Sequence, residues 1–182
     1  MWMLEQNFTQ QSLEDMLGVI GRKEGVNFSR HRMPSHMVAA LRMRGQNMEI
    51  QSCVWGVSVQ KKNIPFLKIE NINVFTSDQF QPVLLPVKVI RFSRELYGSF
   101  TKPIGLIAAL ATKETDGGEP QAMCRIVTCK FEKNTRYPCL RRKPMFISAV
   151  DARQWLKGGL FTKGIERFTR HQPHLKLWDM NF

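Results

Sequence analysis

The sequence predicts a single α+β domain, rich in antiparallel strands, with a few helices packed outside the sheets. Its 182 residues are near the size of one ordinary domain, and no internal repeat, linker or low-complexity segment divides them. Short apolar runs recur between turn residues, whereas few segments show a capped helical pattern. The apolar fraction of 43%, with twelve Phe and four Trp, is enough for a sizeable core.

Two segments carry helix-capping patterns. Ser12 can cap a helix over residues 13–20, with Asp15 at the third helical position completing a capping box. Ser148 and Asp151 form a second capping box near the C-terminal end. Glycines are expected to end both helices, at Gly21 and Gly25 for the first and at Gly158 and Gly159 for the second.

Apolar runs predict strands at residues 37–43, 48–59, 83–92, 104–110, 124–129 and 145–147. The turn at residues 44–47 joins the first two strands as a hairpin, and the turn at 116–118 makes another between 104–110 and 124–129. Pro86 breaks the apolar run over residues 83–92, which predicts that this strand lies at the edge of a sheet or contains a bulge. Residues 71–76 alternate polar and apolar side chains, as a half-buried extended segment does.

Basic residues gather in two loops of this predicted arrangement. Residues 140–144 read Leu-Arg-Arg-Lys-Pro and present guanidinium groups from between packed strands. Residues 27–38 form an irregular basic loop, since Pro34 disfavours a helix there. The tail, residues 160–182, is expected to add one more short element.

The charge of the chain bears on its partners. The formal net charge is +12, from 27 Lys and Arg against 15 Asp and Glu. Nucleic acid is the usual polyanion for such a chain, and the alternative is a charge that serves solubility alone. No apolar run spans a bilayer and the N-terminus has no secretory pattern, so we expect a soluble cytoplasmic protein without a membrane partner or a cofactor.

The four cysteines are Cys53, Cys124, Cys129 and Cys139. No pair forms Cys-x-x-Cys and no His pair has finger spacing, so no metal site is predicted. In a cytosolic chain these thiols are expected to be reduced and partly buried in strands. Cys139 lies beside the basic run, where neighbouring cations could lower its thiol pKa and make it a nucleophile. A structural or merely exposed thiol is the favoured alternative.

Taken in this order, these features resemble the SOS response-associated peptidase family, whose SRAP domain binds single-stranded DNA and cross-links to abasic sites. The resemblance is clearest over residues 104–157. There the family shows an apolar strand, an Ile-Val-Thr strand, a His-x-Arg-x-Pro loop and a helix ending near Trp-Leu. The corresponding segments here are residues 104–110, 126–128, 140–144 and 155–156. The resemblance implies one SRAP-like domain over residues 1–182, with a barrel-like core.

Three weaker similarities lie upstream. Residues 55–57, Trp-Gly-Val, resemble the Trp-Gly-Leu strand of the family. Residues 31–34, His-Arg-Met-Pro, resemble its Asn-x-x-Pro loop. Residues 71–76, Asn-Ile-Asn-Val-Phe-Thr, resemble its Asn-x-Arg-x-Glu-Thr segment.

The catalytic positions of the family are replaced in this chain. Trp2 stands where the family has the cysteine nucleophile, and Leu140 stands where it has the loop histidine that shuttles protons. Asn73, Phe75 and Gly98 replace an arginine and two glutamates. The comparison therefore implies no catalytic residue.

What the comparison retains is a set of binding positions. Trp55, Gly56, Asn71, Thr128 and Arg142 match positions that contact DNA or shape the site in the family. The full predicted DNA-binding set is Arg142, Arg141, Lys143, Asn71, Trp55, Gly56, Thr128, Arg91, Arg94, Arg30 and Arg32. Arg142 is the strongest member, because a guanidinium suits a bidentate phosphate contact. The alternatives are core packing for Trp55, a satisfied turn for Asn71, and a solvated surface for the arginines.

These observations favour a non-catalytic DNA-binding relative of the SRAP proteins that holds single-stranded or junction DNA in a basic groove. One alternative is a scaffold for an acidic protein partner, for example in phage–host or repair competition. The other is an active enzyme that cross-links abasic sites through Cys139 or another cysteine.

Overall fold

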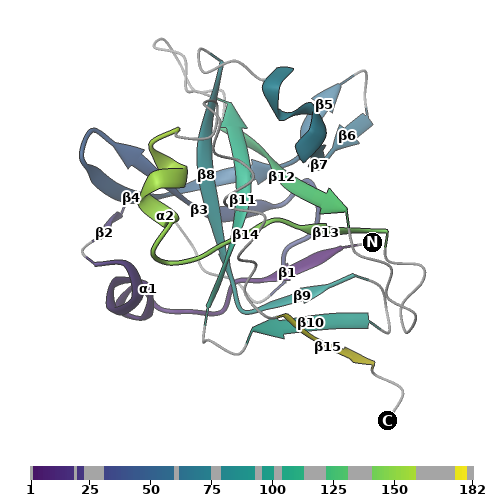
Figure 1. Cartoon of the computed structure of the whole chain (residues 1–182), viewed down its shortest axis with the longest axis horizontal. Coiled ribbons are helices and arrows are strands. Elements are labelled where there is room, and N and C mark those ends of the chain that lie inside the picture. Colours follow the sequence, from purple (N-terminus) through teal and green to yellow (C-terminus); the bar gives the residue numbers. More distant parts are fainter. Residues whose placement is uncertain are drawn as a thin grey trace.

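The computed structural model describes residues 2–18, 20–22, 31–59, 62–74, 79–92, 96–100, 104–112, 122–130, 141–158 and 175–179. Within these ranges the strands form a large mixed sheet, a four-stranded sheet and a two-stranded hairpin (Figure 1). The predicted turn at 116–118, the replaced positions Phe75 and Leu140, and Cys139 lie outside the described residues. The same holds for much of the tail.

Five strands of the large sheet close into a ring. They are β3 (Met37–Arg44), β4 (Asn47–Trp55), β8 (Phe80–Val87), β11 (Gly105–Thr112) and β12 (Met123–Lys130). Their order is β12-β11-β8-β3-β4, and β4 pairs back onto β12 in parallel. The predicted sheet-rich α+β core is thereby confirmed, with a ring consistent with a barrel-like core. The sheet is mixed, however, whereas the sequence predicted sheets rich in antiparallel strands and gave no sign of its parallel pairs.

Four further strands extend this ring. In parallel, β2 (Ile20–Arg22) pairs with β4 and β7 (Phe66–Lys68) pairs with β12. In antiparallel fashion, β13 (Arg142–Pro144) pairs with β12 and β14 (Phe146–Ile147) pairs with β11. Strand β12 therefore pairs with β4, β7, β11 and β13, and it brings together residues from distant parts of the sequence.

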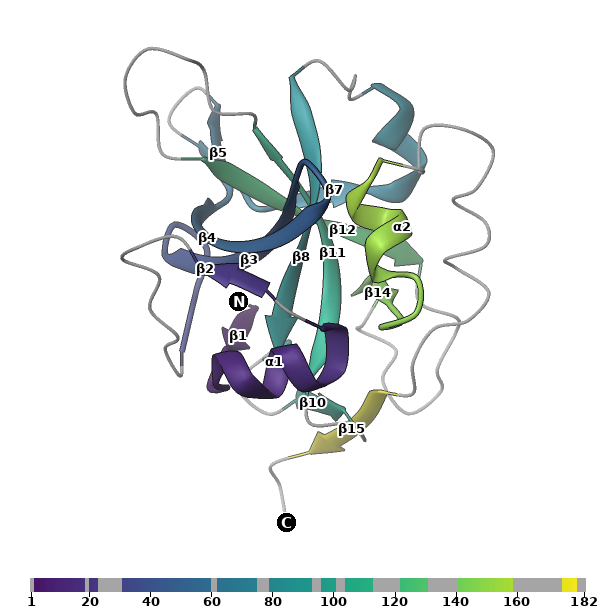
Figure 2. The ribbon, with the colours of Figure 1, turned by 90° about the vertical axis from the view of Figure 1, so that its left-hand side faces the viewer.

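The smaller sheets use the remaining described strands. The four-stranded sheet has the order β1 (Met3–Glu5), β9 (Val89–Arg91), β10 (Leu96–Phe100) and β15 (Leu175–Asp179). Its strands β10 and β15 lie at the lower end of the molecule in both ribbon views (Figures 1 and 2). The hairpin joins β5 (Val57–Val59) to β6 (Lys62–Ile64). The predicted strand over 48–59 is therefore two strands, divided at Gly56.

The first helix begins earlier than the sequence predicted. Helix α1 covers Gln10–Leu17, and Thr9, rather than Ser12, is its N-cap. The Thr9 hydroxyl accepts the Ser12 N–H at 3.2 Å, and the Ser12 hydroxyl accepts the Thr9 N–H at 3.1 Å. Ser12 is thus the reciprocal partner of the cap, since a serine can serve either role. Gly18, at φ +87°, ends the helix before the predicted glycines.

The second helix, α2 (Ala152–Leu156), has Asp151 as its N-cap residue, three residues later than the predicted cap at Ser148, and Asp151 makes no side-chain capping bond. Ser148 accepts the Asp151 N–H at 3.2 Å, and its hydroxyl donates to the Asp151 carboxylate at 2.7 Å. The segment predicted as extended, residues 71–76, is different, because Ile69–Val74 forms the 3₁₀ helix η1. Ile69 and Ile72 lie three residues apart and both pack against the core, a period that suits a 3₁₀ turn.

Strand β8 lies between β11 and β3 in the ring, although it contains Pro82 and Pro86. Its ladder with β3 is a single pair, Leu41 with Leu84, and each proline lies two residues from that pair. The pairing of β8 with β3 therefore does not need the backbone N–H groups that Pro82 and Pro86 lack. Pro86 also accepts a hydrogen bond from the buried Gln6 side chain at 2.9 Å. Of the two alternatives predicted for Pro86, an edge or a bulge, the edge is wrong, because β8 lies between β11 and β3.

Apolar side chains of the ring strands belong to two buried clusters. One contains Leu41, Leu84 and Val127 and is covered by residues of both helices, including Leu13 and Trp155. The other contains residues of the ring and of β1 and β9. In Figure 2 the two helices lie in front of the ring strands β8 and β11. Neither described helix has the length and apolar character needed to cross a bilayer.

Candidate nucleic-acid interface

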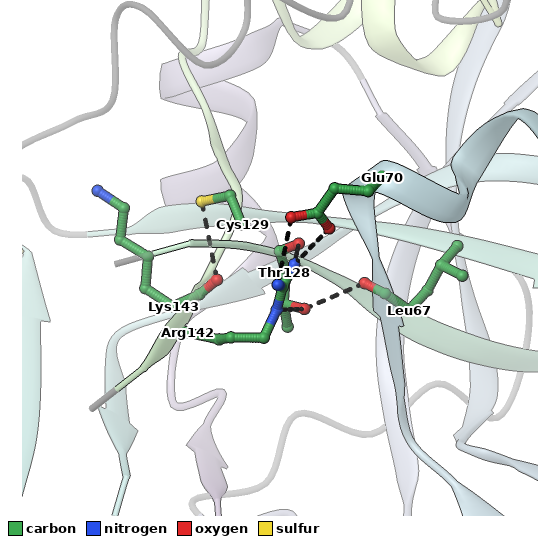
Figure 3. Close-up of polar contacts among 6 residues, drawn as sticks. All are labelled: Leu67, Glu70, Thr128, Cys129, Arg142 and Lys143. Atoms are coloured by element: carbon green, nitrogen blue, oxygen red, sulfur yellow. Dashed lines mark hydrogen bonds and ion pairs between the residues drawn. The ribbon is translucent and has the colours of Figure 1, made fainter. Parts of the chain in front are cut away.

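Arg142, a predicted binding residue, lies at the centre of a hydrogen-bond network with Thr128 and Glu70 (Figure 3). It lies on β13, opposite Lys130 of β12, so this part of the predicted basic loop is a strand. Its Nε donates to the Thr128 hydroxyl at 3.0 Å, and its Nη2 donates to the Thr128 carbonyl at 2.6 Å. Thr128 is only 3% exposed, and its hydroxyl donates to the Leu67 carbonyl at 3.2 Å. The guanidinium is therefore held in one orientation by the sheet.

The outer edge of the same guanidinium binds Glu70, the second residue of η1. Nη2 lies 2.8 Å from Oε2, and Nη1 lies 3.3 Å from Oε1. The hydrogen bond from Arg142 lowers the pKa of the Glu70 carboxyl below its ordinary value, and the positive charge of Lys130 adds to this effect. A carboxylate thus stands at the position where a phosphate contact was predicted.

Register places four polar side chains on one face of β7, β12 and β13. Lys68 pairs with Thr128, and Lys130 pairs with Arg142. Thr128 and Lys130 are two residues apart on one strand, so all four side chains leave the sheet on the same side. Lys68 and Lys130 are exposed. We call the side chains of Lys68, Thr128, Lys130 and Arg142 the basic face.

An aromatic pair adjoins the basic face. Phe66 lies two residues before Lys68 on β7 and pairs with Ile126 of β12, so its side chain leaves the same side of the sheet. Trp2 packs on Phe66 with a centroid distance of 4.6 Å, and on Phe92 at 5.1 Å. Trp2 and Phe66 are both partly exposed. Cations and partly exposed aromatic rings therefore follow one another along this face.

Trp55 belongs to the core. It is fully buried, its indole Nε1 donates to the Pro65 carbonyl at 3.1 Å, and its ring packs edge-on against Phe66 at 6.0 Å. Of the two alternatives for this residue, the structure shows core packing. Trp55 therefore supports Phe66, and none of its own surface is exposed.

Gly56 has a local structural role. Its φ is +109°, a conformation that side chains rarely adopt, and the Asn63 side chain occupies the place of a Cβ. The Asn63 amide donates to the Trp55 carbonyl at 3.4 Å and to the Ser35 hydroxyl. The break after β4 is thus packed against Asn63, which explains why the chain turns there.

The other predicted residues are divided between two places. Arg141 is exposed and Lys143 is half-buried next to Arg142, and the Lys143 carbonyl lies 3.8 Å from the Cys129 sulfur. Asn71 is exposed beside Glu70. In contrast, Arg32 bridges Leu4 and Arg91 pairs with Met3, so these two flank β1. Arg30 and Arg94 lie outside the described residues.

The described cysteines are unpaired thiols, as expected from the sequence. Cys53, Cys124 and Cys129 are all buried in β4 and β12. Contact with the Cys53 thiol, together with burial, raises the pKa of Cys124. Burial also raises the pKa of Cys129, against the opposing effect of Lys143 and Arg142. Among the described residues, no cluster of three or more His, Cys, Asp or Glu side chains could hold a metal ion.

Sequence reasoning missed Glu70, Lys68, Lys130 and Phe66. Lys130 carries a signal in β12 itself, because the alternate positions 124, 126, 128 and 130 change from buried Cys and Ile to a buried Thr and then an exposed Lys. Lys68 and Phe66 lie on β7 and join this face only through the pairing of β7 with β12. Glu70 carried one weak signal, an acidic residue directly before the predicted site residue Asn71 in a basic chain. Its contact with Arg142 spans 72 positions of sequence and depends on the fold.

Comparison with known proteins shows the fold. No family model and no curated protein sequence matches the chain. A crystallised protein of Bordetella bronchiseptica has a TM-score of 0.69 at 14% identity and covers 100% of both chains. A phage-related protein of the same organism has a TM-score of 0.75 at 12% identity, covering 100% of this chain and 95% of its own. A Bacteroides thetaiotaomicron protein has a TM-score of 0.71 at 14% identity, covering 98% and 91%. The chain thus shares a small sheet-rich fold with these bacterial proteins.

Proposed function

We propose that this protein binds single-stranded or junction DNA through the basic face and does not perform the covalent chemistry of the SRAP family. One observation carries the proposal: Lys68, Lys130 and Arg142 leave one side of the sheet beside the aromatic pair of Trp2 and Phe66. Single-stranded nucleic acid is held by this combination, because cations track the phosphates while rings stack on bases. The net charge of +12 adds long-range attraction for a polyanion.

The non-catalytic part of the proposal rests on the replaced positions. Trp2, at the place of the family's nucleophile, has its ring packed on Phe66 and Phe92. Gly98, at the place of one glutamate, is buried in β10 and offers no side chain. The three described thiols are buried. These residues supply no nucleophile at the N-terminal position and no carboxylate at position 98.

The test is binding of a labelled single-stranded oligonucleotide by the full chain, measured by fluorescence anisotropy over about 50 to 300 mM salt. Phosphate-driven binding predicts a linear fall of log K with log salt. The double variant Lys68→Ala, Lys130→Ala should weaken binding at least tenfold at low salt and flatten this slope by about 1.4, since two phosphate contacts are lost. Lys157→Ala, an exposed lysine beside α2, is the matched control and should bind like the unaltered protein.

Absence of binding at about 50 mM salt, where phosphate contacts are strongest, would overturn the proposal. An equal loss in the Lys157→Ala control would also count against it, because binding would then follow total charge rather than the basic face. Capture of one acidic protein at one-to-one stoichiometry, with DNA unbound, would instead support the scaffold alternative.

A further inference from the structure

The contacts of Arg142 separate into an anchor and an exchangeable partner. Thr128 is the anchor: it is buried in β12 and engages Nε and Nη2 through its hydroxyl and carbonyl. Glu70 is the exchangeable partner, because its side chain is 43% exposed and it reaches Arg142 from a separate element, η1. If the carboxylate moves away, the two bonds to Thr128 still orient the guanidinium.

The carboxylate of Glu70 also has the geometry of a bound phosphate. Its two oxygens accept from Nη1 and Nη2, and arginine presents the same pair of donors to two phosphate oxygens. Ion pairs that are exposed to solvent are weak and are screened by salt, so a phosphate held at neighbouring positions can replace the carboxylate. Lys68 and Lys130 offer those neighbouring positions on the same face.

We propose that Glu70 is a specificity-determining residue that occupies Arg142 until a backbone phosphate displaces it. This inference rests on the proposed function and concerns the same face. A single phosphate contacts Arg142 alone and must compete with an intramolecular carboxylate. A strand of contiguous phosphates also contacts Lys68 and Lys130, and their attraction offsets the loss of the ion pair. The site therefore selects polyanionic strands over mononucleotides and inorganic phosphate.

The experiment compares Glu70→Gln with the unaltered full chain in the anisotropy assay. Glutamine keeps the size of the side chain and one acceptor oxygen, but loses the charge that holds Arg142. We expect oligonucleotide binding to tighten about two- to fivefold, the range given by an exposed ion pair. The salt slope should stay close to that of the unaltered chain, because Arg142 contacts the same phosphate in both complexes once Glu70 is displaced.

Two controls isolate the effect of Glu70. Asp15→Asn removes an exposed carboxylate on α1, distant from β13 in Figure 1, and measures the effect of net charge alone. Arg142→Ala in the Glu70→Gln background should abolish the gain. Inorganic phosphate at constant ionic strength should compete with the labelled strand more effectively in Glu70→Gln than in the unaltered chain, which tests the selection against single phosphates.

The outcomes distinguish this inference from the proposed function. If the unaltered chain binds DNA and Glu70→Gln binds no better than Asp15→Asn, the role of Glu70 is overturned and DNA binding stands. If neither the unaltered chain nor Glu70→Gln binds at low salt, the proposed function itself fails. A gain in Glu70→Gln that persists after Arg142→Ala would show a charge effect that does not act through Arg142, and would also overturn the inference.

Discussion

The hydroxyl and the carbonyl of Thr128 both accept hydrogen bonds from Arg142, at 3.0 and 2.6 Å. One buried residue thus fixes two of the three guanidinium nitrogens and leaves the edge formed by Nη1 and Nη2 toward Glu70. An arginine oriented in advance loses less side-chain entropy when it binds an anion. We therefore expect the affinity of Arg142 for a phosphate to depend on Thr128, which holds its guanidinium in place.

Thr128→Val tests this dependence. Valine has nearly the shape of threonine but lacks the hydroxyl, so Arg142 loses the bond to Nε while the strand is kept. We expect binding of a single-stranded oligonucleotide to weaken about three- to tenfold, or about 0.7–1.4 kcal/mol, which is within the range of one ordinary hydrogen bond. Thr128→Ser, which keeps the hydroxyl, should bind within about twofold of the unaltered chain. Equal effects of the two substitutions would contradict the orienting role.

The two tryptophans near Phe66 are expected to affect different quantities, Trp2 the affinity for DNA and Trp55 the stability of the fold. Trp2 is partly exposed, so Trp2→Ala should weaken single-stranded binding by about 1–3 kcal/mol if it stacks on a base. Trp55 is fully buried and donates to Pro65, so Trp55→Phe should lower the free energy of unfolding by about 1–3 kcal/mol. Affinity of folded Trp55→Phe should stay within about twofold. Anisotropy and urea unfolding measure the two quantities, and unchanged affinity of Trp2→Ala would refute stacking.

Gly56→Ala should destabilise the fold by about 1–3 kcal/mol, because alanine at φ +109° is strained and its Cβ meets Asn63. Gly45→Ala is the matched control: Gly45 also has positive φ, at +61°, but its Cβ would meet open space. The difference between the two measures the contact with Asn63. In a double-mutant cycle measured by urea unfolding, Gly56→Ala should therefore lower the free energy of unfolding less in the Asn63→Ala background than in the unaltered chain. Additive changes would show that the Asn63 side chain moves aside for the new Cβ.

The pKa of Glu70 predicts a pH dependence of stability. Because Arg142 lowers this pKa in the folded state, the ion pair contributes stability above the ordinary value of 4.5 and loses it as the pH falls through the folded value. Glu70→Gln should thus be less stable than the unaltered chain by about 0.2–1 kcal/mol at pH 7. In urea unfolding from pH 7 to 3, the difference should begin to shrink near pH 4.5 and vanish below the lowered pKa of folded Glu70. A constant difference, or one shared by Asp15→Asn, would contradict this account.

The buried thiols predict the absence of a covalent DNA adduct. Contact with Cys53 and burial raise the pKa of Cys124, and burial raises that of Cys129, so these groups react slowly as thiolates. Incubation with single-stranded DNA that contains an abasic site should leave no covalent band on a denaturing gel. A band that is lost in Cys139→Ser would establish the enzyme alternative and overturn the non-catalytic proposal.

Much of the fold followed from local patterns. The hairpin of β3 and β4 and the strands β11, β12 and β14 agree with their apolar runs, because alternation and turn residues act over a few neighbours. The contact between Ser148 and Asp151 was likewise local, since the two residues are three apart, although α2 begins only at Ala152. Where two cap patterns overlapped, as at Thr9 and Ser12, spacing alone did not choose between them.

The candidate site was only partly predictable. The sequence by itself determined that the chain is strongly basic and that Arg142 lies beside strands. Tertiary structure decided that Trp55 is buried, that residues 69–74 form a 3₁₀ helix, and that Glu70 reaches Arg142 across 72 positions. The physical reason is that burial and ion pairing depend on which strands become neighbours. The parallel pairing of β12 with β7, which places Lys68 beside Thr128, has no signature in either segment alone.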